Sequence, residues 1–132
     1  FIFAYCSSKL AYWQWAISGD GFHFPKKTLK LFKVDDGILD SNVYSRIVYL
    51  GSLLWEELKN YPVQKTNSGK IIGNYNPLGC QSIIDEIDKK LIAAFGLQNT
   101  FYDYLKKWYY NHIRAGRENF KNAEYIKMEE FR

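Results

Sequence analysis

The longest apolar stripe in the sequence runs through residues 41–60 and stops at a proline. Its members recur every three or four residues, the spacing that places side chains on one face of an α-helix. They are Val43, Ile47, Leu50, Leu54, Leu58 and Tyr61. Pro62 lacks the backbone N–H that would continue the helix, so we predict a helix over 41–60. Gly51 within it costs about 1 kcal/mol relative to Ala, so we expect a neighbouring element to pack closely there.

A β-hairpin and two further helices follow. Residues 63–75 predict a hairpin with its turn around Asn67-Ser68-Gly69. Asn76 and Pro77 suit the cap and first position of a helix over 77–95, which Gly96 ends. Thr100 and Asp103 resemble a capping box, so the last predicted helix covers 100–114.

Residues 1–19 carry almost no charge apart from Lys9. No basic segment or small-residue cleavage site accompanies them, and Ser7, Ser8 and Gln14 interrupt the apolar run, so neither a signal peptide nor a membrane span is expected. We predict instead a buried helix over 2–17 that ends at Gly19-Asp20-Gly21. Its expected core face consists of Phe3, Cys6, Leu10, Trp13 and Ile17.

These elements predict a mainly helical α+β fold, with about four helices and a small β-hairpin. The length of 132 residues fits a single domain, and a hydrophobic fraction of 47% supplies its core. We divide residues 1–132 into an aromatic and basic segment (1–34), a helical body (38–116) and a tail (117–132). The chain begins with Phe1 and its only methionine is Met128, so we expect a fragment of a longer protein.

The sequence contains no pattern typical of a catalytic or metal site. His23 and His112 lie 89 positions apart, and neither Cys6 nor Cys80 stands at ligand spacing from them, so no zinc site is expected. Two cysteines are also too few for a disulfide framework, which favours a cytoplasmic location. We therefore expect the chain to be non-catalytic by itself.

Three carboxylates lie close together on the predicted 77–95 helix, and paired carboxylates can perform acid–base chemistry. They are Asp85, Glu86 and Asp88. Because Lys89 and Lys90 follow them directly, we interpret the group as a solvated, charged helix face.

The positive charge is unevenly distributed. The net charge is +4 with a pI of about 9.0. Basic residues gather in 22–33, in the hairpin at 65–70 and in 104–132, and aromatic residues alternate with the lysines of the first segment. This mixture suits phosphate neutralisation with stacking on bases. A lysine-rich solvated loop over a core explains the composition equally well.

The order of several motifs resembles a known protein family. Residues 8–15 (Ser-Lys-Leu-Ala-Tyr-Trp-Gln-Trp), residues 19–24 (Gly-Asp-Gly-Phe-His-Phe) and Lys26-Lys27 resemble a junction in bacterial DNA adenine-N6 methyltransferases. The second half of the chain is similar to the same family in Tyr75-Asn76, Cys80, residues 84–91 (Ile-Asp-Glu-Ile-Asp-Lys-Lys-Leu), Phe95-Gly96-Leu97 and Arg114-Ala115-Gly116. The resemblance covers residues 6–116 in the family's order.

The resemblance implies the C-terminal target-recognition, or specificity, region of a restriction–modification methyltransferase, including type IIG enzymes that also cleave DNA. In that family an upstream domain binds S-adenosylmethionine and carries an Asn-Pro-Pro-Tyr or Asp-Pro-Pro-Tyr motif. This chain has neither that motif nor a cofactor glycine loop, so no cofactor is expected in it. The implied partners are double-stranded DNA and the upstream methyltransferase domain of the same parent chain, with no membrane.

The basic segment and the hairpin supply the expected DNA contacts. The candidate residues are His23, Lys26, Lys27, Lys30, Lys65 and Lys70. The lysines would neutralise phosphates, while His23 and its neighbours would contribute to sequence specificity. The alternative is a helical protein-interaction module that docks methylase or nuclease domains without contacting DNA.

Overall fold

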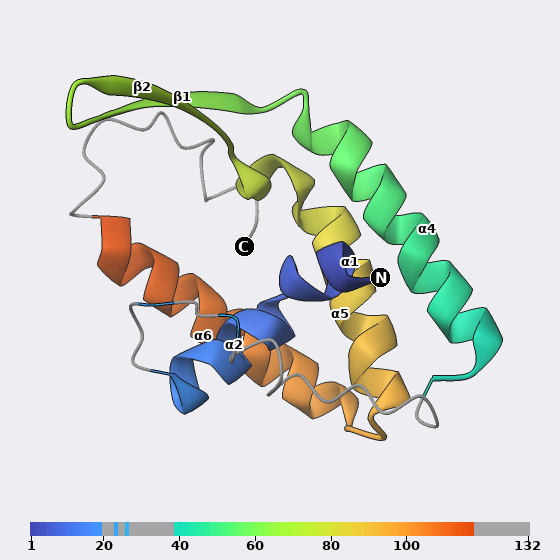
Figure 1. Cartoon of the computed structure of the whole chain (residues 1–132). Helices are drawn as coiled ribbons and strands as arrows, with labels where there is room; N and C mark the ends of the chain where they lie inside the picture. The colour runs from blue at the N-terminus through green and yellow to red at the C-terminus, as the bar shows by residue number, and fades with distance from the viewer. Residues whose placement is uncertain (20–22, 24–25, 27–38, 118–132) are drawn as a thin grey trace.

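The computed structural model describes residues 1–19, 23, 26 and 39–117 (Figure 1). This part of the chain contains five α-helices and one two-stranded antiparallel sheet, which confirms the mainly helical α+β fold with a hairpin. The elements are α1 (Ile2–Cys6), α2 (Lys9–Ser18), α4 (Ser41–Leu58), β1 (Pro62–Asn67), β2 (Lys70–Tyr75), the 3₁₀ turn η1 (Pro77–Cys80), α5 (Gln81–Ala94) and α6 (Asn99–Arg117).

Helix α5 occupies the centre of the fold. Helix α4 packs against it on one side, α2 and α6 pack against it on the other, and α1 contacts both α4 and α5 (Figure 1). The apolar faces of these helices meet in one core. Its fully buried members include Ile47, Leu50, Leu54, Ile84, Ile87, Leu91, Ile92 and Leu105.

The predicted helix over 41–60 is present as α4 and ends two residues earlier, at Leu58. Asp40 caps its first turn, where one carboxylate oxygen accepts hydrogen bonds from the backbone N–H groups of Asn42 and Val43, both at 2.8 Å. The expected close packing at Gly51 is also confirmed. A Cβ added to Gly51 would lie 3.0 Å from the Cβ of Ala4, so its absence lets α1 approach α4.

The hairpin and its turn are as predicted. Strands β1 and β2 pair from Pro62 opposite Tyr75 to Asn67 opposite Lys70. Ser68 and Gly69 connect them with φ values of 50° and 77°, and the tightest hairpin turns require such positive angles. All six residues of β2 are exposed, so the hairpin extends beyond the helical core.

The helix predicted over 77–95 begins with the 3₁₀ turn η1 and continues as α5. The Asn76 side chain accepts a hydrogen bond from the N–H of Leu78 at 3.0 Å, so the expected cap is present. Gly96 follows α5 with a φ of 68°, and the N–H of Leu97 reaches back to the carbonyl of Ile92 at 3.0 Å. This is a Schellman motif, which explains why α5 ends where Gly96 predicts. The last predicted helix, 100–114, is present as α6 and is longer at both ends.

The prediction of one helix over 2–17 is wrong, because the chain breaks at Ser7 and Ser8 into α1 and α2. Ser8 has an extended backbone, and its hydroxyl accepts a hydrogen bond from the N–H of Ala11 at 3.0 Å, so it begins a new helix. The break also changes which side chains face the core. The buried apolar residues are Ala4, Tyr5, Leu10 and Ala11, whereas the expected core residues Phe3, Cys6 and Ile17 are exposed.

Among the described residues, no helix combines the length and apolar character that crossing a membrane requires.

The central position of α5 yields a stability prediction. Leu91 has no exposed surface, so Leu91→Ala leaves a cavity and should lower the free energy of unfolding by about 2–5 kcal/mol. Leu53→Ala removes a side chain of α4 that is 39% exposed, so it should lower the free energy of unfolding by about 1 kcal/mol or less. Urea unfolding monitored by circular dichroism measures both values. Equal losses for the two variants would contradict the burial of the α5 stripe.

Candidate functional site

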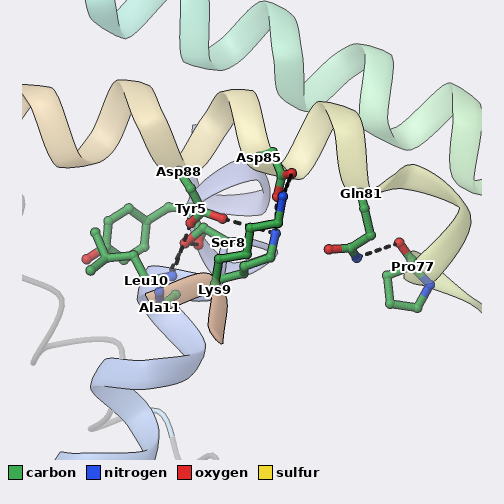
Figure 2. Close-up of polar contacts among 10 residues, drawn as sticks. Tyr5, Ser8, Lys9, Leu10, Ala11, Pro77, Gln81, Asp85 and Asp88 are labelled. Atoms are coloured by element: carbon green, nitrogen blue, oxygen red, sulfur yellow. Dashed lines mark hydrogen bonds and ion pairs between the residues drawn. The ribbon is translucent and has the colours of Figure 1, made fainter. Parts of the chain in front are cut away.

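A buried lysine lies where α2 meets α5 (Figure 2). The Lys9 side chain has no exposed surface, and its ammonium lies 2.5 Å from Asp85 Oδ1 and 3.5 Å from Asp88 Oδ2. Lys106 of α6 contacts the other oxygen of Asp85 at 3.4 Å. The ammonium of Lys9 also lies 5.3 Å from the ring centroid of Tyr109. Three helices therefore share one group of charges inside the fold.

Asp88 also caps the beginning of α2. Its Oδ1 accepts a hydrogen bond from the N–H of Leu10 at 3.1 Å, across 78 positions of sequence. Together with Ser8, which receives the N–H of Ala11, it satisfies donors that the first turn of a helix leaves unpaired. A carboxylate at this end is further favoured by the helix dipole. Asp88 thus joins α5 to α2 by both an ion pair and a helix cap.

The interpretation of the α5 carboxylates as a solvated face is wrong for two of the three. Asp88 is completely buried, and only 19% of the Asp85 side chain is exposed, because both point toward α2. Glu86 alone is on the surface, where it pairs with Arg46 of α4 at 2.5 Å. Burial raises the pKa of Asp88 to about 6, against the opposing effects of Lys9 and the backbone N–H donors.

The group formed by Lys9, Asp85, Asp88 and Lys106, which we call the Lys9 centre, stabilises packing and offers little chemistry. Each of its charged groups already has a partner of opposite sign within the protein. Within the described ranges, no three histidine, cysteine or acidic side chains are grouped so as to hold a metal ion.

A second cluster, made of aromatic rings, lies between α2 and α6. The ring of Tyr12 lies 5.5 Å from that of Trp15, 5.5 Å from Trp108 and 5.6 Å from Tyr109. The ring of His112 lies on Trp108 with centroids 3.9 Å apart. Trp15 donates a hydrogen bond from Nε1 to the backbone carbonyl of His23 at 2.9 Å. The ring of His112 and the backbone of His23 therefore both contact this aromatic cluster, although the two residues are distant in sequence.

The candidate DNA contacts fall in two separate places. His23 and Lys26 are exposed in the segment after α2, while Lys27 and Lys30 lie outside the described residues. Lys65 pairs through its backbone with Ile72 in the hairpin, and Lys70 is exposed at the start of β2. The hairpin lies at the top of Figure 1 and α2 at the bottom. The described candidates therefore do not form one basic patch.

Sequence reasoning missed two groups. The Lys9 centre had a signal, since a single lysine in an otherwise uncharged segment requires a carboxylate if the segment is buried. The Trp108–His112 pair had a weaker signal, because its i,i+4 spacing places both rings on one side of a helix. In each case the partner from α2 or α5 is far away in sequence.

Comparison of the chain with models of protein families, with curated proteins and with solved structures found no match.

The Lys9 centre predicts a large effect of losing its cation. Lys9→Met leaves Asp88 buried without its counter-ion, so it should lower the free energy of unfolding by about 3–5 kcal/mol. Lys106→Met, which removes a lysine that is 37% exposed, should cost about 1 kcal/mol or less. Chemical denaturation of both variants measures the difference. A cost below about 1 kcal/mol for Lys9→Met would show that the buried pair does not hold α2 to α5.

The raised pKa of Asp88 predicts a pH dependence with a definite sign. Because its folded pKa of about 6 exceeds the unfolded value of about 4, the folded state binds the proton more tightly. The free energy of unfolding should therefore rise as the pH falls from about 6 to about 4, by roughly 1–3 kcal/mol relative to Asp88→Asn. Thermal or urea unfolding of both proteins across this range measures the difference. A pH-independent difference would contradict the shift.

Proposed function

We propose that this chain recognises a specific sequence in double-stranded DNA on behalf of a restriction–modification adenine methyltransferase. One observation supports the proposal above others. The segments that carry the family resemblance in the two halves of the chain contact each other, since Lys9 pairs with Asp85 and the N–H of Leu10 binds Asp88. Two motifs that are 76 residues apart thus act as parts of one structural unit.

The same unit contacts one of the residues proposed to bind DNA, His23, through its backbone. The start of α2 is fixed by Ser8 and Asp88, and Trp15 near its end holds the backbone of His23. His23 and Lys26 therefore follow a helix whose N-terminus is fixed to α5. A fixed support of this kind favours specific recognition, because less conformational freedom is lost on binding.

The proposed division of labour follows from the side chains. Lys26, Lys27 and Lys30 neutralise phosphates, and His23 with its neighbours contributes to specificity. Lys65 and Lys70 provide a second contact at the hairpin. An upstream domain of the same parent chain supplies S-adenosylmethionine and the methyl transfer, in the cytoplasm, and the present chain is non-catalytic alone.

A second candidate function, docking of a methylase or nuclease domain without DNA contact, is favoured by an apolar surface over α1 and α4. Trp55 is 46% exposed, and its ring meets those of Phe3 and Tyr75 edge-on at 5.8 and 5.9 Å. Other exposed apolar side chains of these two helices are Ile2, Tyr44, Val48, Tyr49 and Leu53. Exposed apolar surface of this kind often marks a protein interface. Salt-dependent binding to DNA discriminates between the two functions.

The experiment measures DNA affinity against salt concentration. Replacing Lys26 and Lys27 together by Ala should weaken binding similarly on all sequences, because phosphate contacts carry no sequence information. It should also flatten the slope of log affinity against log salt by about two units, at about 0.9 per phosphate.

A double alanine variant at Lys89 and Lys90 is the matched control. It removes the same charge from an exposed lysine pair on α5. Its salt slope should stay near that of the wild type. Equal slopes for both double variants, with circular dichroism unchanged, would exclude the segment after α2 from the interface.

A further inference from the structure

The pairing of Trp108 with His112 on α6 has no evident role in the core. His112 is exposed and Trp108 is partly exposed, while the buried side of α6 is formed by Tyr102 and Leu105. The two rings stack at 3.9 Å with an interplanar angle of 31°. Since Tyr12 of α2 contacts Trp108 from another helix, the stack is held in place at the surface.

The hydrogen bonding of His112 fixes its tautomer. Its Nδ1 lies 2.8 Å from the backbone carbonyl of Trp108, and a carbonyl can only accept, so Nδ1 carries the proton and donates it. In the neutral ring Nε2 is then an acceptor, and in the protonated ring it becomes a second donor. An exposed imidazole with a fixed ring and a defined outer nitrogen suits a polar partner.

The charge of the neighbouring residues favours an anionic partner. The sequence of α6 contains four basic residues, Lys106, Lys107, Arg114 and Arg117, and one acidic residue, Asp103. The sequence of α4, on the far side of α5, contains Arg46 with Glu56 and Glu57. The sequence of α6 is therefore more basic than that of α4, which favours contact between a polyanion and α6.

The same cluster adjoins the segment already proposed to bind DNA. Trp15 and Trp108 both contact Tyr12, and Trp15 holds the backbone of His23. The stack on α6 therefore continues the surface that begins at His23.

We infer that Trp108, His112 and the exposed Lys107 form a further contact of this protein with duplex DNA, separate from the hairpin and directed at the sugar–phosphate backbone. The inference rests on the proposed function and extends it to a helix that the sequence did not single out. Lys107 neutralises a phosphate, His112 in its protonated form donates a hydrogen bond from Nε2 to a phosphate oxygen, and Trp108 holds the imidazole. Contacts of this kind position the duplex for base recognition elsewhere.

The test uses short duplexes of two unrelated sequences, with binding followed by fluorescence anisotropy over a range of salt. Lys107→Ala should reduce the salt slope by about 0.9, and His112→Ala should weaken binding about tenfold on both sequences. Lys59→Ala, at the C-cap of α4, removes an exposed lysine on the other side of α5 and should leave the salt slope unchanged.

Tryptophan emission gives an independent readout. Trp108 lies in the proposed contact and Trp55 lies on α4. Added DNA should quench the tryptophan emission of the wild type. In Trp108→Phe the decrease in emission on adding DNA should be smaller, whereas in Trp55→Phe it should be as large as in the wild type. Because Lys107 is on the surface, its variant tests the contact even if a Trp108 variant unfolds.

The outcomes separate the two proposals. If the wild-type chain binds neither duplex at low salt, both the proposed function and this contact fail. If the wild type binds and the Lys107, His112 and Trp108 variants behave like it, the contact on α6 is wrong while the proposed function stands. Loss of affinity on only one of the two sequences would also overturn the assignment to the backbone, because it would indicate base recognition.

Discussion

The pairing of Lys9 with Asp88 is the interaction on which the arrangement of this fold depends. Placing an ammonium and a carboxylate in a helical core is costly unless each finds a partner and the remaining hydrogen bonds are made. Here Asp88 meets both the ammonium of Lys9 and the N–H of Leu10, and Lys9 also meets Asp85. Apolar packing alone is compatible with many orientations of one helix on another. The ion pair and the N–H bond to Asp88 form in only one orientation of α2 on α5.

The fold presents two unlike surfaces on either side of α5. Apolar and aromatic side chains are exposed along α4 beside Arg46 and Glu56, whereas α6 presents Trp108 beside His112 and Lys107, next to Tyr12 of α2. The first surface suits another protein, and the second suits a polyanion. Because α5 separates the two surfaces, the proposed DNA recognition and a docking to a catalytic domain do not compete for the same side chains.

The features predicted correctly from sequence have local causes. Helix α4 follows from its apolar stripe and Pro62, and the hairpin follows from Ser68 and Gly69, which lie within a few residues of what they determine. The burial of Asp88 was not predicted, because its partners are 78 and 79 positions away. The break at Ser8 was missed because the apolar spacing across it imitates one continuous helix. For the proposed DNA contacts the sequence supplies the positive charges and their order along the chain. Only the fold shows that the backbone of His23 and the ring of His112 meet the same aromatic cluster.

The cap of α2 by Asp88 has a consequence for the order of folding. A short helix gains little from its own hydrogen bonds in water and depends on caps and packing to persist. Half of the cap of α2 comes from a residue made much later during synthesis, so α2 stays unsupported on the ribosome until α5 has emerged and docked. Closing so long a loop slows folding compared with a bundle of local contacts. The amide of Leu10 should accordingly gain protection from hydrogen exchange together with α5, and later than the interior of α4.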